Sequence, residues 1–152
     1  MRSNGEKVVP AKVLAEECIA VRLRLINRVV TGIYDEVFRP YGVRVSQMNI
    51  LGVIGLLGQA SPAQVCQILH LEKSTLSRNV GRMRSKGWLE TVPEENGRPH
   101  WLRVTRKGNK ILEKAFPAWR EAQQKAISLI GEEGVNAIAR IAQILCSKEI
   151  EG

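Results

Sequence analysis

Two short helical patterns that follow each other closely, at residues 64–69 and 74–86, constrain the fold of this chain more than any other feature. The first is introduced by SPAQ at 61–64, where a capping serine, a proline in the first turn and a glutamine three residues after the serine form a capping box. The connection between the two patterns is tight. Together they predict a helix-turn-helix.

The second of these helices has two unlike faces. Leu76, Val80 and Met83 lie at i, i+4 and i+7, so they share one apolar face. Gly87 follows at the position where a helix commonly ends on a glycine. We expect the apolar face to pack in a core. The opposite face and its shoulders carry hydroxyls, a glycine and arginines, in Ser74, Thr75, Ser77, Arg78, Gly81, Arg82 and Ser85.

Two short apolar and basic segments, at residues 88–92 and 101–105, follow this helix. Asn96-Gly97 lies between them and is a strong signal for a tight turn, so the two segments predict a β-hairpin. A hairpin directly after a helix-turn-helix makes a winged helix. In that arrangement the second helix enters the major groove of DNA with its amino-terminal residues nearest the bases.

The side chains on this helix and at the hairpin tip suit contact with DNA. Small polar residues come first, which lets the backbone approach, and arginines follow, which suit guanine edges and phosphates. At the tip, Gly97 keeps the turn slim and Arg98 suits a narrow minor groove. The candidate DNA-binding residues are Lys73, Ser74, Thr75, Ser77, Arg78, Arg82 and Arg98.

The distribution of charge also favours a polyanionic partner. Residues 72–110 hold ten basic and four acidic side chains, a net charge of +6 out of +8 for the whole chain. Nucleic acid is the commonest polyanion that such a local excess meets, and the alternative is a solvated basic face. No apolar run is long enough to span a bilayer and residues 1–12 lack the apolar stretch of a signal peptide, so we expect a cytoplasmic protein.

Apolar helical patterns flank this central region on both sides. One runs over residues 11–38, and Ser46 is a candidate N-cap for the helix that comes next. Thr105 is placed to cap a later helix, which Pro117 should kink. A last helix has its apolar residues at Val135, Ile138, Ala142 and Leu145.

The terminal helices carry more apolar surface than a small core needs, which predicts a homodimer; the alternative is that they pack only on their own domain. The expected fold is mainly α (α+β), a winged helix-turn-helix with a two-stranded hairpin and long N- and C-terminal dimerisation helices. We expect a single domain over residues 11–149, with the winged-helix core at about 45–108 and the dimerisation helices at about 11–39 and 105–149.

This order of elements resembles the MarR family (multiple antibiotic resistance regulators). LHLEKSTLSRNVGRMRSKGWLE is similar to that family's recognition segment, and NGRPHWLRVTRKG resembles its wing, where Asp-Arg-Arg precedes Leu-Thr-x-x-Gly. Arg98 matches the last arginine of the triplet, Val104-Thr105 match Leu-Thr, and Gly108 matches the glycine. Asn96-Gly97 replace the usual Asp-Arg, and Glu94 or Glu95 are candidates to replace the aspartate that commonly holds the wing arginine.

The resemblance covers about residues 11–147 and implies a winged-helix homodimer that binds a pseudo-palindromic operator and represses nearby genes. It also implies that a small ligand or an oxidant releases the DNA. In the family such ligands are often phenolic or aromatic acids, and they bind between the dimerisation helices and the winged helix.

Other reactive residues give weaker signals. Cys18 is a candidate for ligand or redox sensing, although it lies about one turn earlier than the family's reactive cysteine, and its helical face favours a buried, inert thiol. Cys66 and His70 lie at i, i+4, but two ligands do not make a zinc site, so we expect no metal and no cofactor. We attribute the glycines at 52, 55 and 58 to close packing of helices.

Two other functions compete with a sequence-specific repressor. One is an architectural or RNA-binding winged helix, for which lysines alone would serve. The other is an enzyme on the same scaffold, such as an alkyl-transfer repair protein, which would need an activated cysteine in the hairpin or the recognition helix. None of the three cysteines lies there, so we expect the chain not to be an enzyme.

Overall fold

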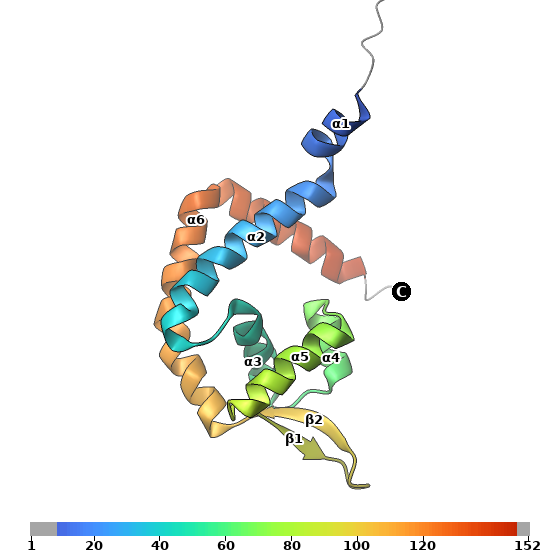
Figure 1. Cartoon of the computed structure of the whole chain (residues 1–152), viewed down its shortest axis with the longest axis vertical. Helices are drawn as coiled ribbons and strands as arrows, with labels where there is room; N and C mark the ends of the chain where they lie inside the picture. Colours follow the sequence, from blue (N-terminus) through green and yellow to red (C-terminus); the bar gives the residue numbers. More distant parts are fainter. Residues whose placement is uncertain (1–8, 149–152) are drawn as a thin grey trace, which may run out of the picture. The chain divides into compact units, whose positions relative to one another are not determined.

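The computed structural model describes residues 9–148 and is mainly helical with one antiparallel hairpin, which confirms the expected fold class (Figure 1). The chain divides into two compact units after Gly32. Among the described residues, no helix is both long and apolar enough to cross a membrane. The elements are α1 (Pro10–Glu17), α2 (Ile19–Phe38), the 3-10 helix η1 (Arg39–Tyr41), α3 (Val45–Leu57), α4 (Pro62–Leu69), α5 (Lys73–Ser85), β1 (Leu89–Pro93), β2 (Pro99–Val104) and α6 (Arg106–Lys148).

The first unit contains a helix break that the sequence did not predict. The single helix expected over residues 11–38 is two helices, because Cys18 has an extended backbone (φ −66°, ψ 116°) between α1 and α2. The break leaves backbone carbonyl groups at the end of α1 without a helical partner. The Arg22 guanidinium donates to one of them, the Glu16 carbonyl oxygen, at 2.5 Å. Cys18 itself is half-buried, so the expectation of a buried thiol was wrong.

The core of the second unit lies between α3, α4, α5, the hairpin and the first part of α6. Helix α3 is apolar on most of its surface and buries side chains from successive turns. Helices α4 and α5 and strand β2 bring their apolar side chains onto it. The largest fully buried side chains are Phe38, Ile50, Leu51, Ile54, Val65, Leu76, Met83 and Leu102.

The starts of α4 and α3 differ in whether the local sequence predicts the residue that caps the helix. The capping box before α4 is confirmed, since Ser61 Oγ accepts from the Gln64 amide at 3.2 Å and Gln64 Oε1 accepts from the Ser61 amide at 2.9 Å. The assignment of Ser46 as the N-cap of α3 was wrong, because that helix begins one residue earlier. Asp35 Oδ1 accepts from the Val45 amide at 2.8 Å, and Gln47 Oε1 accepts from the Arg44 amide at 3.1 Å. The start of α3 is therefore capped by a carboxylate from α2 together with a glutamine of its own first turn.

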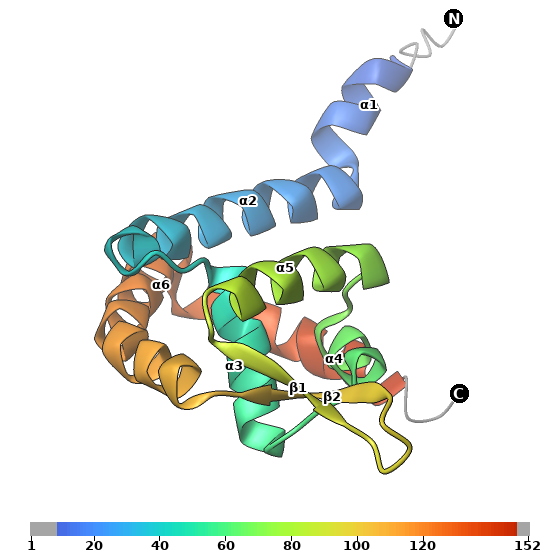
Figure 2. The same ribbon diagram turned by 60° about the horizontal axis from the view of Figure 1, so that its bottom comes forward.

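The hairpin has the predicted turn and a firm base. Leu89 pairs with Val104, and Gly97 adopts the positive φ of 80° that the turn requires. At the base, Ala60 and Leu102 exchange two backbone hydrogen bonds of 3.0 and 2.8 Å, which tie β2 to the segment between α3 and α4. Figure 2 shows the loop of the hairpin extending beyond the strands and away from α5.

Helix α6 joins the two C-terminal helices expected from the sequence. Thr105 caps it as predicted, with Oγ1 accepting from the Gly108 amide at 3.0 Å. The helix continues through Pro117, and its non-helical residue is Gly131 (φ 78°, ψ 159°). Only glycine adopts that backbone conformation at low cost, so the break between the two expected helices falls at Gly131.

Candidate nucleic-acid interface

The polar face of α5 is solvent-exposed, and its apolar face is fixed in the core. Leu76 and Met83 are 2% and 0% exposed and hold the helix from beneath. Thr75 is half-buried on a shoulder, and its carbonyl accepts from Asn79 Nδ2 at 3.1 Å. The exposed candidates on this helix are Lys73, Ser74, Ser77, Arg78 and Arg82.

The start of α5 is suited to an anion, a feature that the sequence analysis missed. Glu72 is its N-cap residue but makes no side-chain hydrogen bond to the first turn. The amides of that turn therefore have no side-chain cap, and the positive end of the helix dipole lies beside exposed Lys73 and Ser74. A backbone phosphate fits such a helix start.

The tip of the hairpin is closed by Asn96. Its Oδ1 accepts from the Arg98 amide at 2.9 Å, and its Nδ2 lies 3.3 Å from Glu94 Oε2. The Gly97 amide donates to the Glu94 carbonyl at 2.8 Å. Asn96 therefore holds the backbone of the turn, and the Arg98 side chain is exposed at the tip.

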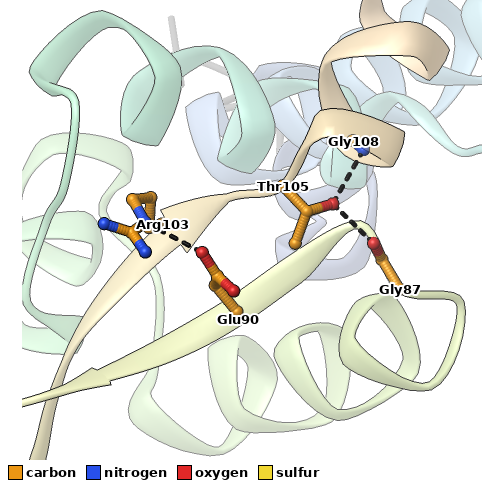
Figure 3. Close-up of polar contacts among 5 residues, drawn as sticks. All are labelled: Gly87, Glu90, Arg103, Thr105 and Gly108. Atoms are coloured by element: carbon orange, nitrogen blue, oxygen red, sulfur yellow. Dashed lines mark hydrogen bonds and ion pairs between the residues drawn. The ribbon is translucent and has the colours of Figure 1, made fainter.

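The stem of the hairpin uses one of its arginines internally. Arg103 Nε donates to Glu90 Oε1 at 2.8 Å, and these two residues face each other across the strands (Figure 3). Both side chains are about half exposed, so the pair adds little stability. It does neutralise one guanidinium of the basic region, and this leaves Arg103 a poorer candidate for DNA than Arg98.

Thr105 joins the end of α5 to the start of α6. Its Oγ1 donates to the Gly87 carbonyl at 2.5 Å and accepts from the Gly108 amide, as Figure 3 shows. Gly108 lies so close to Trp88 that a Cβ atom would stand 2.2 Å from the Trp88 carbonyl oxygen. This contact was not predicted, although the residues that make it were named. The junction fixes the angle between α5, the hairpin and α6.

Lys86, at the end of α5, has structural contacts. Its Nζ donates to the Gly42 carbonyl at 2.5 Å and lies 4.4 Å from the centre of the Trp88 ring. Gly42 follows η1 in the left-handed conformation (φ 64°), and Trp88 is only 6% exposed. Lys86 therefore ties the end of α5 to the segment before α3.

An apolar groove lies beside this interface. It has a cavity volume of about 720 Å³ and opens to solvent between α3, α4 and α6. Phe116 and Trp119 stack in one wall, with ring centres 5.6 Å apart and planes 5° apart. The lining residues are Met48, Asn49, Gly52, Val53, Leu69, Leu112, Glu113, Phe116 and Trp119.

The remaining candidates are scattered. Cys18 and Cys66 are half-buried and Cys146 is exposed, and all three are free thiols. Within residues 9–148 no three side chains of the metal-binding kinds come together.

Tyr34 donates a hydrogen bond to Gln123 Oε1, and burial raises the pKa of that tyrosine above its usual value. It thus stays protonated and joins α2 to α6 inside the second unit.

Comparison with known proteins gives matches in sequence and in structure. The family model described as "MarR family" matches residues 41–98, which cover α3 to the hairpin tip. The chain is 25% identical over 148 residues, 95% of its own length and 94% of the relative's, to YdgG of Bacillus subtilis, an uncharacterised HTH-type transcriptional regulator. It is 26% identical to the regulator PecS of Dickeya dadantii, over 65% of this chain and 62% of that one.

Solved structures share the fold. A mutant MarR from Escherichia coli complexed with operator DNA superposes with a TM-score of 0.76 at 20% identity, over 88% of this chain and 97% of that one. BpsR of Bordetella bronchiseptica gives a TM-score of 0.74 at 15% identity, over 86% and 94% of the two chains; its structure concerns regulation of DNA binding by 6-hydroxynicotinic acid.

Proposed function

We propose a DNA-binding role for this chain, which belongs to the MarR family of transcriptional regulators. In this proposal the chain is a homodimeric repressor of a pseudo-palindromic operator. The observation that carries it is the exposed polar and basic face of α5, held by buried Leu76 and Met83 beside the hairpin that presents Arg98. The MarR structure with operator DNA shares this fold and supports the same use of the helix.

We assign a distinct contact with DNA to each group of side chains in the interface. The small residues Ser74, Thr75 and Ser77 let the amino-terminal half of α5 approach base edges. Arg78 and Arg82 follow on the same face and suit guanine edges or flanking phosphates. Lys73 and the uncapped amides of the first turn suit a phosphate. Arg98 enters the minor groove beside the major-groove contacts.

A second copy of the chain would cover the exposed apolar side chains at both ends. In the first unit Ile19 and Leu25 are 71% and 62% exposed, and in the last part of α6 Ile144 and Leu145 are 54% and 59% exposed. Leaving such helices in water is unfavourable, and association of two chains removes that cost. We propose that residues 11–149 act as one domain in this dimer, although residue 149 lies outside the described residues.

A small effector would bind in the groove between α3, α4 and α6. The groove has the size and apolar lining of a ligand site. The groove touches α6 at Leu112, about one turn after Gly108. A ligand there would contact the part of α6 that the Thr105 junction joins to α5. The regulation of BpsR by 6-hydroxynicotinic acid supports this part of the proposal.

The test is binding of the full chain to the promoter fragment upstream of its own gene and to a random duplex of the same length. A repressor should bind the promoter at least about a thousandfold more tightly, with strong salt dependence on both. Equal affinities would favour the architectural role, and tighter binding to RNA would favour the RNA-binding role. A cytoplasmic location and the absence of enzymatic activity stay predictions.

A further inference from the structure

We infer that Lys86 is a positioning residue that fixes the direction of the exposed polar face of α5 and thereby contributes to the choice of DNA sequence. This inference rests on the proposed function, because it assumes that α5 reads base edges. Lys86 differs from Arg78 and Arg82 in acting through the placement of the helix, whereas those two side chains contact the DNA.

Two contacts hold the Lys86 side chain at the carboxyl end of α5. Lys86 is the C-cap residue of that helix, and its Nζ donates to the Gly42 carbonyl at 2.5 Å. The same ammonium lies 4.4 Å from the centre of the Trp88 ring. A hydrogen bond from a charged donor is stronger than one between neutral groups, and the face of an indole ring attracts a cation. The charge of Lys86 is therefore engaged by the protein on two sides.

The two partners of Lys86 are themselves held in place. Gly42 is the C-cap of η1 in the left-handed conformation, and the next residue, Val43, is buried in the core. Trp88 is also buried, and its carbonyl accepts from the Thr105 amide at 3.0 Å. A side chain that contacts two fixed groups restricts the helix end that carries it.

The Gly42 contact holds α5 to a different segment from the Thr105 junction. Thr105 and Gly108 join the end of α5 to α6, whereas Gly42 lies between η1 and α3, beside the carboxyl end of α5 (Figure 2). A helix end that is held at two separate segments has less freedom to tilt than one held at a single segment. Base contacts depend on this, because a binding surface must stay within about 0.5 Å of its productive geometry. Contacts with phosphates position a protein but do not read sequence.

The position of Lys86 beside Arg82 gives a second reason for holding its side chain. The two residues lie at i, i+4 on one shoulder of α5, where like charges repel each other. Within residues 9–148 no ion pair involves either of them. The Gly42 carbonyl and the Trp88 ring engage the Lys86 ammonium, and the Arg82 side chain stays exposed for DNA. A direct contact of Lys86 with a phosphate is the alternative that the experiment distinguishes.

The experiment compares Lys86→Gln and Lys86→Arg in the full-length protein. Fluorescence anisotropy gives their affinities for the promoter fragment and for a random duplex over a range of salt concentrations. We expect Lys86→Gln to bind the promoter about three- to tenfold more weakly, with random-duplex binding and salt dependence nearly unchanged. Lys86→Arg should keep most of the promoter affinity, because a guanidinium also donates to a carbonyl and stacks on an indole.

Arg84→Gln is the matched control, and a second readout needs no DNA. Arg84 is an exposed cation in the last turn of α5, and no ion pair or hydrogen bond of its side chain links it to a described residue. The control should leave the ratio of promoter to random-duplex affinity unchanged. In nuclear magnetic resonance spectra of the free protein, the Trp88 indole signal should shift in Lys86→Gln and stay in place in Arg84→Gln.

Three results would overturn the inference. The first is a salt dependence that falls by about one phosphate contact on both duplexes with an unchanged affinity ratio, which would make Lys86 a phosphate contact. The second is unchanged promoter binding by Lys86→Gln, and the third is an unshifted Trp88 signal in that variant. Lys86→Met, which keeps the apolar stem beside Trp88, replaces the glutamine variant if that protein does not fold. A wild type that binds both duplexes equally would instead refute the proposed function itself.

Discussion

At the scale of single residues, the contacts that matter most are those at the Thr105 junction. The Thr105 hydroxyl bridges the Gly87 carbonyl and the Gly108 amide, and Gly108 lies directly against Trp88. These residues lie at the carboxyl end of α5 and outside the set of candidate DNA contacts, and they hold α5 against α6. Their role is therefore separable from that of the arginines that contact DNA.

Gly108→Ala tests the junction. The added methyl would stand 2.2 Å from the Trp88 carbonyl oxygen, so backbone must shift, and we expect a loss of about 1–3 kcal/mol in the free energy of unfolding. Denaturant unfolding measures it. Gly81→Ala is the matched control, since no atom lies within 4 Å of its Cβ position and alanine favours the helix. An equal stability change in the two variants would contradict the assigned contact.

Arg78→Ala and Arg82→Ala test base reading. If either side chain reads a guanine, its loss should cost about 1–3 kcal/mol on the operator and much less on random duplex. Fluorescence anisotropy on both duplexes measures the difference. Arg103→Ala serves as comparison, because Glu90 already engages that guanidinium, and any loss there should be equal on both duplexes. Equal losses for the α5 arginines would leave them as phosphate contacts only.

At the scale of elements, the sequence predicted what local patterns determine. The capping box at Ser61, the Asn96-Gly97 turn and the apolar face of α5 each depend on residues a few positions apart, and the structure has all three. At the start of α3 the Val45 amide donates to Asp35, ten residues away on another helix, and the local pattern pointed to Ser46 instead. No proline or glycine marks the break at Cys18, and the Gly131 break competed with a stronger signal at Pro117.

The residues of the candidate site also divide into those that local patterns predicted and those whose contacts depend on tertiary packing. The polar face of α5 and the exposed Arg98 follow from helical and turn periodicity. The engagement of Arg103 by Glu90, the hydrogen bond of Lys86 to Gly42 and the groove depend on tertiary packing. A count of basic residues could not tell which of them the fold itself uses.

The hairpin as an element is tested by Arg98→Ala. Its exposed guanidinium should use the negative potential of a narrow A·T-rich minor groove. The variant should bind the operator more weakly, and its salt dependence should fall by about one phosphate-equivalent contact. Thermal unfolding should change little, because an exposed tip adds little to the core. Replacing the flanking A·T pairs with G·C should harm the wild type more than the variant, and equal harm would exclude the groove contact.

At the scale of the whole molecule, association should depend on the exposed apolar ends. Ile144→Glu combined with Leu145→Glu places charge on a surface that is already 54% and 59% exposed, so the fold of one chain should survive. Analytical ultracentrifugation at micromolar concentration should show a dimer for the wild type and a monomer for the variant. Leu56→Glu, at an 87% exposed position outside these helices, is the control and should remain dimeric. A wild type that sediments as a monomer would refute the dimer.

A dimer that carries two copies of α5 predicts a specific spacing of contacts on the bound DNA. A two-fold symmetric dimer should protect two half-sites whose centres are about one helical turn, or a multiple of it, apart, with minor-groove protection where Arg98 enters. Hydroxyl-radical footprinting of the full-length protein on its promoter fragment measures this directly. The expected result is a symmetric pattern of protected half-sites and flanks. Uniform protection that follows protein concentration without discrete half-sites would contradict sequence-specific binding by a dimer.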